Sequence, residues 1–309
     1  MVRTNKDGGR ERKYVLKPRT IINMSDKHKI IYSLDVHPIM NNRWKMGNKS
    51  TETIYMTALS ILYSHLWYSD IELYVDEMAY KFLYMLPCKV IQVAKNENEE
   101  LWMKSKINAM MQQTKPFVHL DTDVFIRKKI DFSFSDILLE RSEQDYATHY
   151  RPQVDFFNQY TQNLLYWNHD LGYTYNCGIL GFNNLELRDQ FVSAYYDLEK
   201  IYLENREAFI VLKEQGQEPC ILIEQYTLAT LLNHNNIEPS LLLKGENIIE
   251  QGKDADEMGY SHFHGTKKYE KYIVDEIELR LSKIFPYWYM QIKSALQKEG
   301  VMANNPQFV

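Results

Sequence analysis

The chain has 309 residues, of which 45% are hydrophobic and 25% are charged, as in ordinary globular proteins and unlike disordered chains. Its formal net charge of -5 argues against a general nucleic-acid-binding protein. The three cysteines, Cys88, Cys177 and Cys220, have no paired spacing, which indicates a reducing compartment. The start does not resemble a secretory signal, and no apolar run is long enough to span a membrane. We therefore expect a cytoplasmic protein.

The first 29 residues are strongly basic, with nine Lys or Arg against three acidic residues. We expect residues 1–28 to form a flexible, solvated arm. Contact with an anionic partner, or peripheral contact with a membrane surface, is the alternative role for such an arm. We expect no nucleic-acid partner.

After the arm, strand and helix patterns alternate. Strand patterns cover residues 29–34, 71–75, 89–93 and 115–120, and helical patterns cover 51–67, 76–86 and 99–113. This order predicts an α/β sheet with mostly parallel strands, which binds ligands at the carboxyl ends of those strands.

The second half of the chain is less regular. Helical patterns cover residues 153–167, 185–213 and 219–232, and apolar strands are predicted over 173–182 and 260–264. The end, from 268 to 298, is helical and broken near Pro286. Because no linker is evident, we expect one compact unit with helices added at its C-terminal end.

Two carboxylates directly follow the strand that ends at Leu120, in the motif Asp121-Thr122-Asp123. A hard divalent cation takes oxygen ligands, and it neutralises charge on a diphosphate leaving group. The alternative is a strand-end turn in which the aspartates serve as caps. The motif occurs once more, at residues 254–256, where a polar context predicts a solvated loop.

Three further segments carry chemically suggestive residues. Residues 260–269 place His262 and His264 on one face of a predicted strand, ahead of a glycine and two lysines. An imidazole can complete the coordination of a metal ion held by carboxylates, and a lysine can bind phosphate. Residues 175–183 form a strand with two glycines, which indicates a close approach by a ligand or by crowded core backbone. The third segment is the pair Glu224-Gln225 on an apolar helix, where a buried carboxylate needs a partner.

In this order the four segments resemble the nucleotide-sugar glycosyltransferases of the GT-A fold. The likeness is to family 8, the group of glycogenin and the lipopolysaccharide galactosyltransferases, and it covers roughly residues 29 to 270. The matching motifs are Asp-Thr-Asp at 121–123, Asn-Cys-Gly-Ile at 176–179, Glu-Gln at 224–225, and His-Phe-His-Gly-Thr-Lys-Lys at 262–268. The resemblance implies a GT-A (Rossmann-like) catalytic domain over 29–270, with C-terminal helices over 271–309 packed on it.

The resemblance also assigns the metal and diphosphate ligands. It implies that Asp121, Asp123 and His262 hold Mn²⁺ or Mg²⁺, although His264 shares the strand face with His262. It implies that Gly265 and Lys268 contact the diphosphate. The donor would be a nucleotide diphosphate sugar, with a UDP-sugar the first choice.

On the sugar side, the resemblance places Asn176 near the donor sugar and Glu224 or Gln225 near the reacting anomeric carbon. A basic residue ahead of the Asp-Thr-Asp strand touches the donor in that family. Lys104 fits its spacing best, and Lys106 comes second. Asp35, just after the first strand, matches a contact to the nucleotide base.

The sequence departs from the family pattern at several positions. Glu224 stands where the family usually has Asp, Tyr269-Glu270 follow the lysines where Pro-Trp is usual, and His37-Pro38 lie in the first-strand loop in place of small polar residues. These differences indicate a divergent branch, and they leave the donor sugar and the acceptor open.

The predicted function is metal-dependent, hexosyltransferase-like glycosyl transfer to a saccharide, lipid-linked, peptide or small-molecule acceptor. The resemblance implies retention of anomeric configuration. An inverting enzyme would need a general base, for which Glu143, Asp145 and Glu224 are candidates. The alternative function is a non-catalytic module on the same fold that binds nucleotide sugars or partner proteins. A nucleotidyltransferase ranks low, because no glycine-rich loop follows the first strand.

Overall fold

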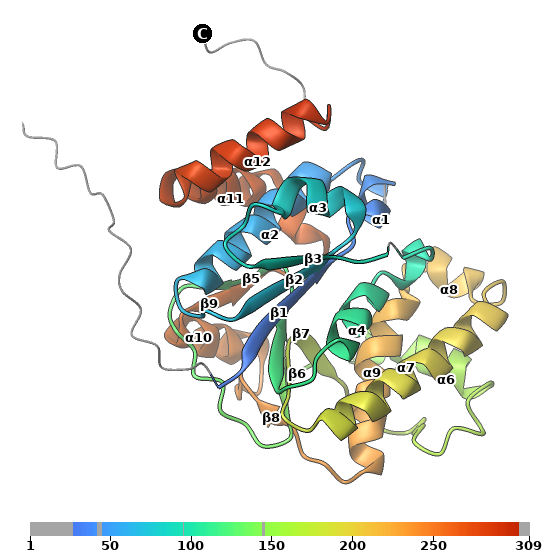
Figure 1. Cartoon of the computed structure of the whole chain (residues 1–309). Helices are drawn as coiled ribbons and strands as arrows, with labels where there is room; N and C mark the ends of the chain where they lie inside the picture. Colours follow the sequence, from blue (N-terminus) through green and yellow to red (C-terminus); the bar gives the residue numbers. More distant parts are fainter. Residues whose placement is uncertain (1–26, 42–44, 95, 144–145, 303–309) are drawn as a thin grey trace, which may run out of the picture.

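The computed structural model describes residues 27–41, 45–94, 96–143 and 146–302, and a seven-stranded sheet runs through it (Figure 1). The predicted arm and Asp145 lie outside the described residues, except for Lys27 and His28. The strand order is β3-β2-β1-β4-β7-β6-β8. The strands are β1 Lys29–Leu34, β2 Ile71–Val75, β3 Lys89–Gln92, β4 Phe117–Leu120, β7 Tyr175–Phe182, β6 Ile137–Ser142 and β8 Ser240–Leu241.

Strands β1 to β4 are parallel, and β7 then runs antiparallel between β4 and β6. β6 pairs in parallel with the short edge strand β8. The expected mixed, mostly parallel sheet flanked by helices is therefore confirmed. Because β1, β2 and β4 run in one direction, their carboxyl ends meet at one edge of the sheet.

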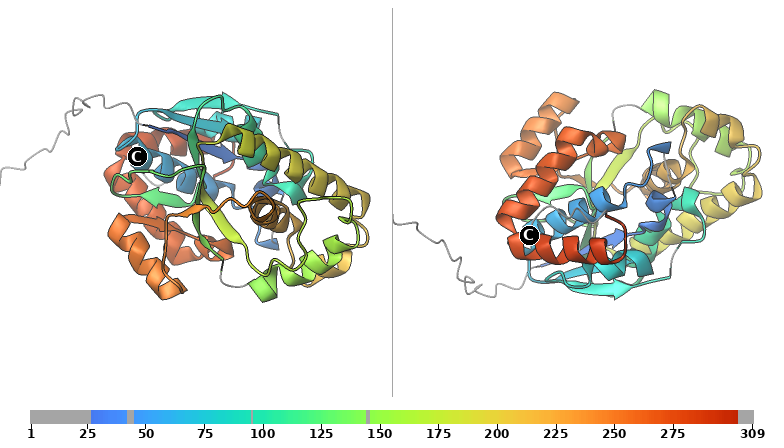
Figure 2. Two further views of the ribbon diagram at one scale, coloured as in Figure 1. Left: turned by 90° about the horizontal axis from the view of Figure 1, so that it is seen from below. Right: turned by 90° about the horizontal axis from the view of Figure 1, so that it is seen from above.

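Alternate residues of β1 enter two different cores on the two faces of the sheet. Ile30, Tyr32 and Leu34 pack into the core beneath α2, α11 and α12, while Ile31 belongs to the core beneath α4, α7 and α9. Figures 1 and 2 show these two groups of helices on opposite sides of the sheet.

The helices of the first core are α2 Ser50–His65, α3 Glu77–Leu83, α11 Lys271–Ile284 and α12 Pro286–Lys298. Those of the second are α4 Lys104–Met111, α6 Arg151–Asn158, α7 Leu185–Glu204 and α9 Pro219–His234. Shorter elements are α1 His37–Met40, η2 Glu99–Leu101, α5 Tyr146–His149, α8 Ile210–Glu214, α10 Ile248–Met258 and η3 Gly265–Tyr269. The two C-terminal helices pack on α2 and α3, with the break at Pro286 as expected.

A second sheet of two strands joins distant parts of the chain. β5 Val124–Ile126 pairs antiparallel with β9 Tyr260–His262, in a register that sets Val124 opposite His262. The residue after β9, Phe263, donates its backbone N–H to the carbonyl of Asp123 at 3.2 Å. This small sheet therefore holds the late histidine segment against the Asp-Thr-Asp turn.

Several predicted elements are shorter than expected. The predicted helix over 99–113 is divided into η2 and α4, and the one over 153–167 ends at Asn158. The predicted helix over 185–213 is interrupted at Asn205, where both the backbone N–H and the side-chain amide bond to the carbonyl of Ile201. The strand predicted over 260–264 ends at His262.

The second Asp-x-Asp sequence was predicted to lie in a solvated loop. This prediction is wrong, because residues 254–256 belong to helix α10. The Asp254 carboxylate accepts backbone hydrogen bonds from Lys244 and Gly245, and Asp256 forms an exposed ion pair with Arg127 at 3.3 Å. Both carboxylates therefore have structural partners.

The helices of the described residues were compared with the length and apolarity that a membrane span needs. None of the helices there is both long enough and apolar enough to cross a bilayer.

The buried guanidinium of Arg188 ties α7 to α4. It donates to the carbonyls of Met110 and Gln113 at 2.5 and 2.9 Å, while its Nε binds the exposed Asp189. Arg188→Ala removes the side-chain donor from both carbonyls, although that of Met110 keeps the backbone N–H of Gln113. Because the Gln113 carbonyl loses its charged donor, we expect a loss of about 1–3 kcal/mol in the free energy of unfolding, measured by urea denaturation. Asp189→Asn is the matched control, with a change within about 0.5 kcal/mol. Equal effects of the two variants would contradict this role of the carbonyl contacts.

Candidate active site

The turn after β4 presents the two carboxylates of the Asp-Thr-Asp motif at the carboxyl edge of the sheet. The Asp121 N–H donates to the carbonyl of Gly178 at 2.8 Å, and the Val124 N–H donates to the carbonyl of Asp121 at 3.0 Å. The turn is thereby fixed to the neighbouring strand β7. A cleft opens at this edge, and its lining includes Asp35, Trp102, Lys106, Asp121, Asp123 and Lys268.

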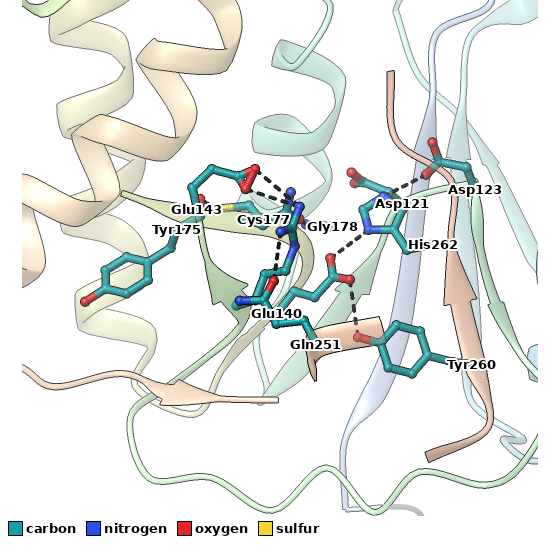
Figure 3. Close-up of polar contacts among 12 residues, drawn as sticks. Asp121, Asp123, Glu140, Glu143, Tyr175, Cys177, Gly178, Gln251, Tyr260 and His262 are labelled. Atoms are coloured by element: carbon teal, nitrogen blue, oxygen red, sulfur yellow. Dashed lines mark hydrogen bonds and ion pairs between the residues drawn. The ribbon is translucent and has the colours of Figure 1, made fainter. Parts of the chain in front are cut away.

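A chain of hydrogen bonds and ion pairs runs from Asp123 through His262 to Glu140 on β6 (Figure 3). His262 Nε2 lies 3.4 Å from Asp123 Oδ1, and its Nδ1 lies 2.7 Å from Glu140 Oε2. Tyr260 donates its hydroxyl to the other Glu140 oxygen at 3.3 Å. Glu140 therefore fixes the ring orientation and leaves Nε2 facing the Asp-Thr-Asp motif, as carboxylates do for metal-binding histidines.

The charges of this chain stabilise one another. Burial lowers the pKa of His262, but Glu140 and Asp123 outweigh it and raise that pKa to about 10. Burial likewise raises the pKa of Asp123, but Lys268, 2.6 Å away, and His262 bring it well below its usual range. Without a metal, His262 is therefore an imidazolium and Asp123 a carboxylate.

Gly178 explains why β7 carries a glycine at this point. A Cβ placed there would lie 2.1 Å from His262 Cε1 and 2.7 Å from Glu140 Oε2. Only glycine lets the imidazole and its carboxylate partner pack this closely on the strand. The other glycine of β7, Gly181, is also closely packed, since a Cβ there would lie 2.7 Å from Phe134. Neighbouring side chains therefore leave no room for a Cβ at either glycine.

A second group of charges centres on the ammonium of Lys106, whose side chain is 3% exposed. It lies 3.0 Å from Asp121 Oδ1 and 2.9 Å from Glu224 Oε1, and it donates to the carbonyl of Cys177 at 2.6 Å. Burial, opposed by Lys106 and reinforced by Asp121, raises the pKa of Glu224 to about 7. The partner expected for the buried Glu224 is therefore the ammonium of Lys106. Lys106 lines the cleft and contacts both Glu224 and Asp121.

The two groups together carry an excess of negative charge. Four carboxylates face two ammonium groups and one imidazolium, namely Asp121, Asp123, Glu140 and Glu224 against Lys106, Lys268 and His262. With every group ionised, one negative charge is left over; burial raises the pKa of both Asp121 and Glu224, which reduces this excess near neutral pH. A divalent cation that replaces the imidazolium proton would bring the group to zero.

The donor set also fits such an ion. Asp121, Asp123 and His262 offer one ligand atom each, all within 4.8 Å of one another, and together they could hold a divalent metal ion. His264 belongs to a different set, with Glu140 and His262. Its ring centre is 3.9 Å from that of His262, and burial together with the His262 charge lowers its pKa to about 3.

The basic residue beside Asp121 is Lys106 and not Lys104, which fitted the family spacing best. Lys104 lies on the other side of α4 and forms an ion pair with Glu199 of α7 at 2.5 Å. Residues two apart on a helix point in different directions, so only Lys106 faces the sheet edge.

The other residues predicted for the donor side lie around this centre. The Asn176 side chain accepts the Gly178 N–H at 2.9 Å, and Gln225 accepts a hydrogen bond from the hydroxyl of Tyr150. Gly265 begins η3 with a φ of 60°, and a Cβ there would meet open space. Glu143 forms an ion pair at 3.3 Å with Arg141, which directly follows Glu140.

Asp35 lines the cleft and is held by backbone donors. It accepts from the N–H groups of His37 at 3.2 Å and Asn96 at 3.1 Å. Burial and the neighbouring Asp76 carboxylate raise its pKa to about 7.

Glu140 is the residue that the sequence analysis missed. It lies in β6, a strand that was not predicted and that pairs with β7 on one side and with β8 on the other. The signal in the sequence was a glutamate directly after the apolar run Ile137-Leu138-Leu139, since a buried carboxylate needs a partner.

Residues 28–295 match the model of a family described as a family of unknown function, DUF6734, and the chain belongs to that family. No curated protein matches the chain. Among solved structures, the chain is similar to the apo form of the bifunctional glycosyltransferase WbbM, with a TM-score of 0.46 and 11% identity over 88% of this chain and 52% of that one. It is also similar to the glycosyltransferase GlyE of Streptococcus pneumoniae TIGR4, with a TM-score of 0.44 and 11% identity over 92% and 67% of the two chains. The chain spans about half the length of the WbbM chain.

The close contact at Gly178 yields a first prediction for the site. In Gly178→Ala the new methyl group must displace His262 or β7, so we expect about 1–3 kcal/mol of destabilisation together with loss of Mn²⁺ binding, measured by calorimetric titration. Gly181→Ala, which meets only Phe134 and Leu138, is the matched control. It should be destabilised but should keep Mn²⁺ affinity. Retained Mn²⁺ affinity in folded Gly178→Ala would contradict the proposed ligand geometry.

Glu140→Gln tests the support behind His262. The amide keeps the shape of the side chain but removes the charge that orients the imidazole, so Mn²⁺ affinity should fall by about 10- to 100-fold. Asp256→Asn, at the other Asp-x-Asp sequence, should leave that affinity unchanged. Titration calorimetry measures the Mn²⁺ affinity of both variants. An unchanged affinity in Glu140→Gln would show that the hydrogen bond from His262 to Glu140 does not support metal binding.

Proposed function

We propose that this member of the DUF6734 family is a metal-dependent glycosyltransferase that uses a nucleotide diphosphate sugar. One observation carries the proposal: ligand atoms of Asp121, Asp123 and His262 lie within 4.8 Å of one another at the carboxyl edge of the sheet, beside the ammonium of Lys268. Sheets of this kind bind nucleotides at that edge. The family-8 motif order supports a UDP-sugar as donor and retention of configuration.

The metal would be held by Asp121, Asp123 and His262, with Glu140 as the support behind the imidazole. When bound, Mn²⁺ or Mg²⁺ supplies positive charge that stabilises the leaving diphosphate. The neighbouring Lys268 now pairs with Asp123, and its ammonium is within reach of any phosphate oxygen that the same cation binds. Gly265, at the start of the same turn, exposes backbone without a Cβ and allows a phosphate to approach.

Lys106 and Glu224 hold the opposite wall of the cleft. Lys106 fixes one oxygen of Asp121 through a 3.0 Å ion pair, and it is itself fixed by Glu224 and by a backbone carbonyl. We assign Glu224 as a positioning residue that acts through Lys106. By the family resemblance, we assign Asn176 and Gln225 to the donor sugar and Asp35, which lines the cleft, to the nucleotide base.

The experiment is a thermal-shift screen of UDP-sugars with and without Mn²⁺, followed by an assay of UDP release. A ligand at 100 times its dissociation constant stabilises the native state by about 2.7 kcal/mol, so the correct donor should raise the melting temperature only when metal is present. Asp123→Asn should remain folded and lose this metal-dependent shift, because Lys268 and His262 lose their charged partner.

Asp254→Asn and Asp256→Asn are the matched controls, since both lie in α10 and have structural partners. They should keep the shift seen with the unchanged chain. Metal-dependent binding that disappears in these variants but survives in Asp123→Asn would refute the assignment of the site.

A further inference from the structure

A second pocket, of about 470 Å³, adjoins the cleft. One wall comes from η2 and the residue after it, and the other comes from the turn between α8 and α9, including Gly216, Gln217 and Glu218. Its volume falls in the range of about 300–1,000 Å³ that small-molecule sites occupy. None of the residues assigned so far to the metal or the diphosphate lines it.

Trp102 lies in the wall that separates this pocket from the cleft, since its side chain lines both. It ends η2 and comes two residues before α4, whose Lys106 reaches Asp121. A molecule in the second pocket would therefore lie one side chain away from the donor cleft. The reacting atoms of acceptor and donor must come within about 3–3.5 Å of each other, so the acceptor hydroxyl would extend past the edge of Trp102 into the cleft.

The walls of the pocket are held together by a network of ion pairs. Glu100 of η2 pairs with Lys213 of α8 and with Arg206 at 2.8 Å, and it accepts the hydroxyl of Tyr202 at 2.7 Å. Burial raises the pKa of Glu100, but these three partners bring it down to about 2. The two walls are thus joined by contacts that do not depend on a ligand.

The lining of the pocket indicates the chemistry of its ligand. It contains four carboxylates and two lysines, an excess of two negative charges, together with the amide of Gln217 and the indole of Trp102. Negative charge disfavours phosphates and acidic ligands. Several hydrogen-bonding groups beside one aromatic wall suit a molecule with many hydroxyls and an apolar ring face.

We infer that this pocket is the acceptor site and that its ligand is a neutral saccharide stacked on Trp102. The inference rests on the proposed function, because it takes the neighbouring cleft to be the donor site. It narrows the acceptor from a saccharide, lipid-linked, peptide or small-molecule acceptor to an uncharged sugar or an uncharged glycan end.

The test measures saccharide binding separately from donor binding. A panel of glucose, galactose, N-acetylglucosamine, maltose, lactose and cellobiose is screened by saturation-transfer NMR, and the best ligand is titrated. Trp102→Ala should weaken that ligand about tenfold, and Trp102→Phe should restore most of the affinity, because the stacking face is kept. Glu218→Gln, which lies in the second pocket and not in the cleft, should weaken the saccharide without changing the thermal shift given by Mn²⁺ and UDP-sugar.

Asp123→Asn is the reciprocal control, and it should lose the donor while keeping the saccharide. If no sugar of the panel binds, or if the titrated sugar is lost in Asp123→Asn but unchanged in Trp102→Ala and Glu218→Gln, the inference is overturned. Failure of the proposed function gives a different result: no UDP-sugar shifts the unchanged chain in the presence of Mn²⁺, whatever the saccharides do.

Discussion

Charge buried at the carboxyl edge of the sheet is the constraint on which the rest of this molecule depends. Isolated charges in a protein interior are costly, and each therefore needs a partner with good geometry. Lys106 satisfies this condition with two carboxylates and a carbonyl, while Asp123, His262 and Glu140 satisfy it in a chain. Counted at formal charge, the partners leave one negative charge over, which supports the proposed binding of a divalent cation there.

This constraint accounts for features of the fold that lie far from the motif in sequence. The β5–β9 pairing holds His262 next to Asp123, and β6 is placed beside β7 so that Glu140 meets the other nitrogen of the same ring. Gly178 on β7 provides the space that this contact needs. The cluster thus takes residues from β6, β7 and β9 and from the turn between β4 and β5, and the strand order brings them to one place.

The sequence was sufficient for the parts of this arrangement that depend on local pattern. Alternating strand and helix signals predicted β1 to β4, and the carboxylates after a buried strand identified Asp121 and Asp123. Contacts across the sheet were not predictable in the same way. The first five residues of β6 are all buried, so the strand shows no alternation of apolar and polar residues, and Glu140 was not identified. Lys104 and Lys106 differ only in the direction in which α4 points them, which packing against the sheet decides.

The measurement that tests the account most directly is anomalous diffraction from crystals grown with Mn²⁺ and UDP. The account predicts one manganese peak bonded to carboxylate oxygens of Asp121 and Asp123 and to Nε2 of His262, with Glu140 still bound to Nδ1. A peak at Glu140, His262 and His264, a peak beside α10, or no peak at saturating Mn²⁺ would contradict it.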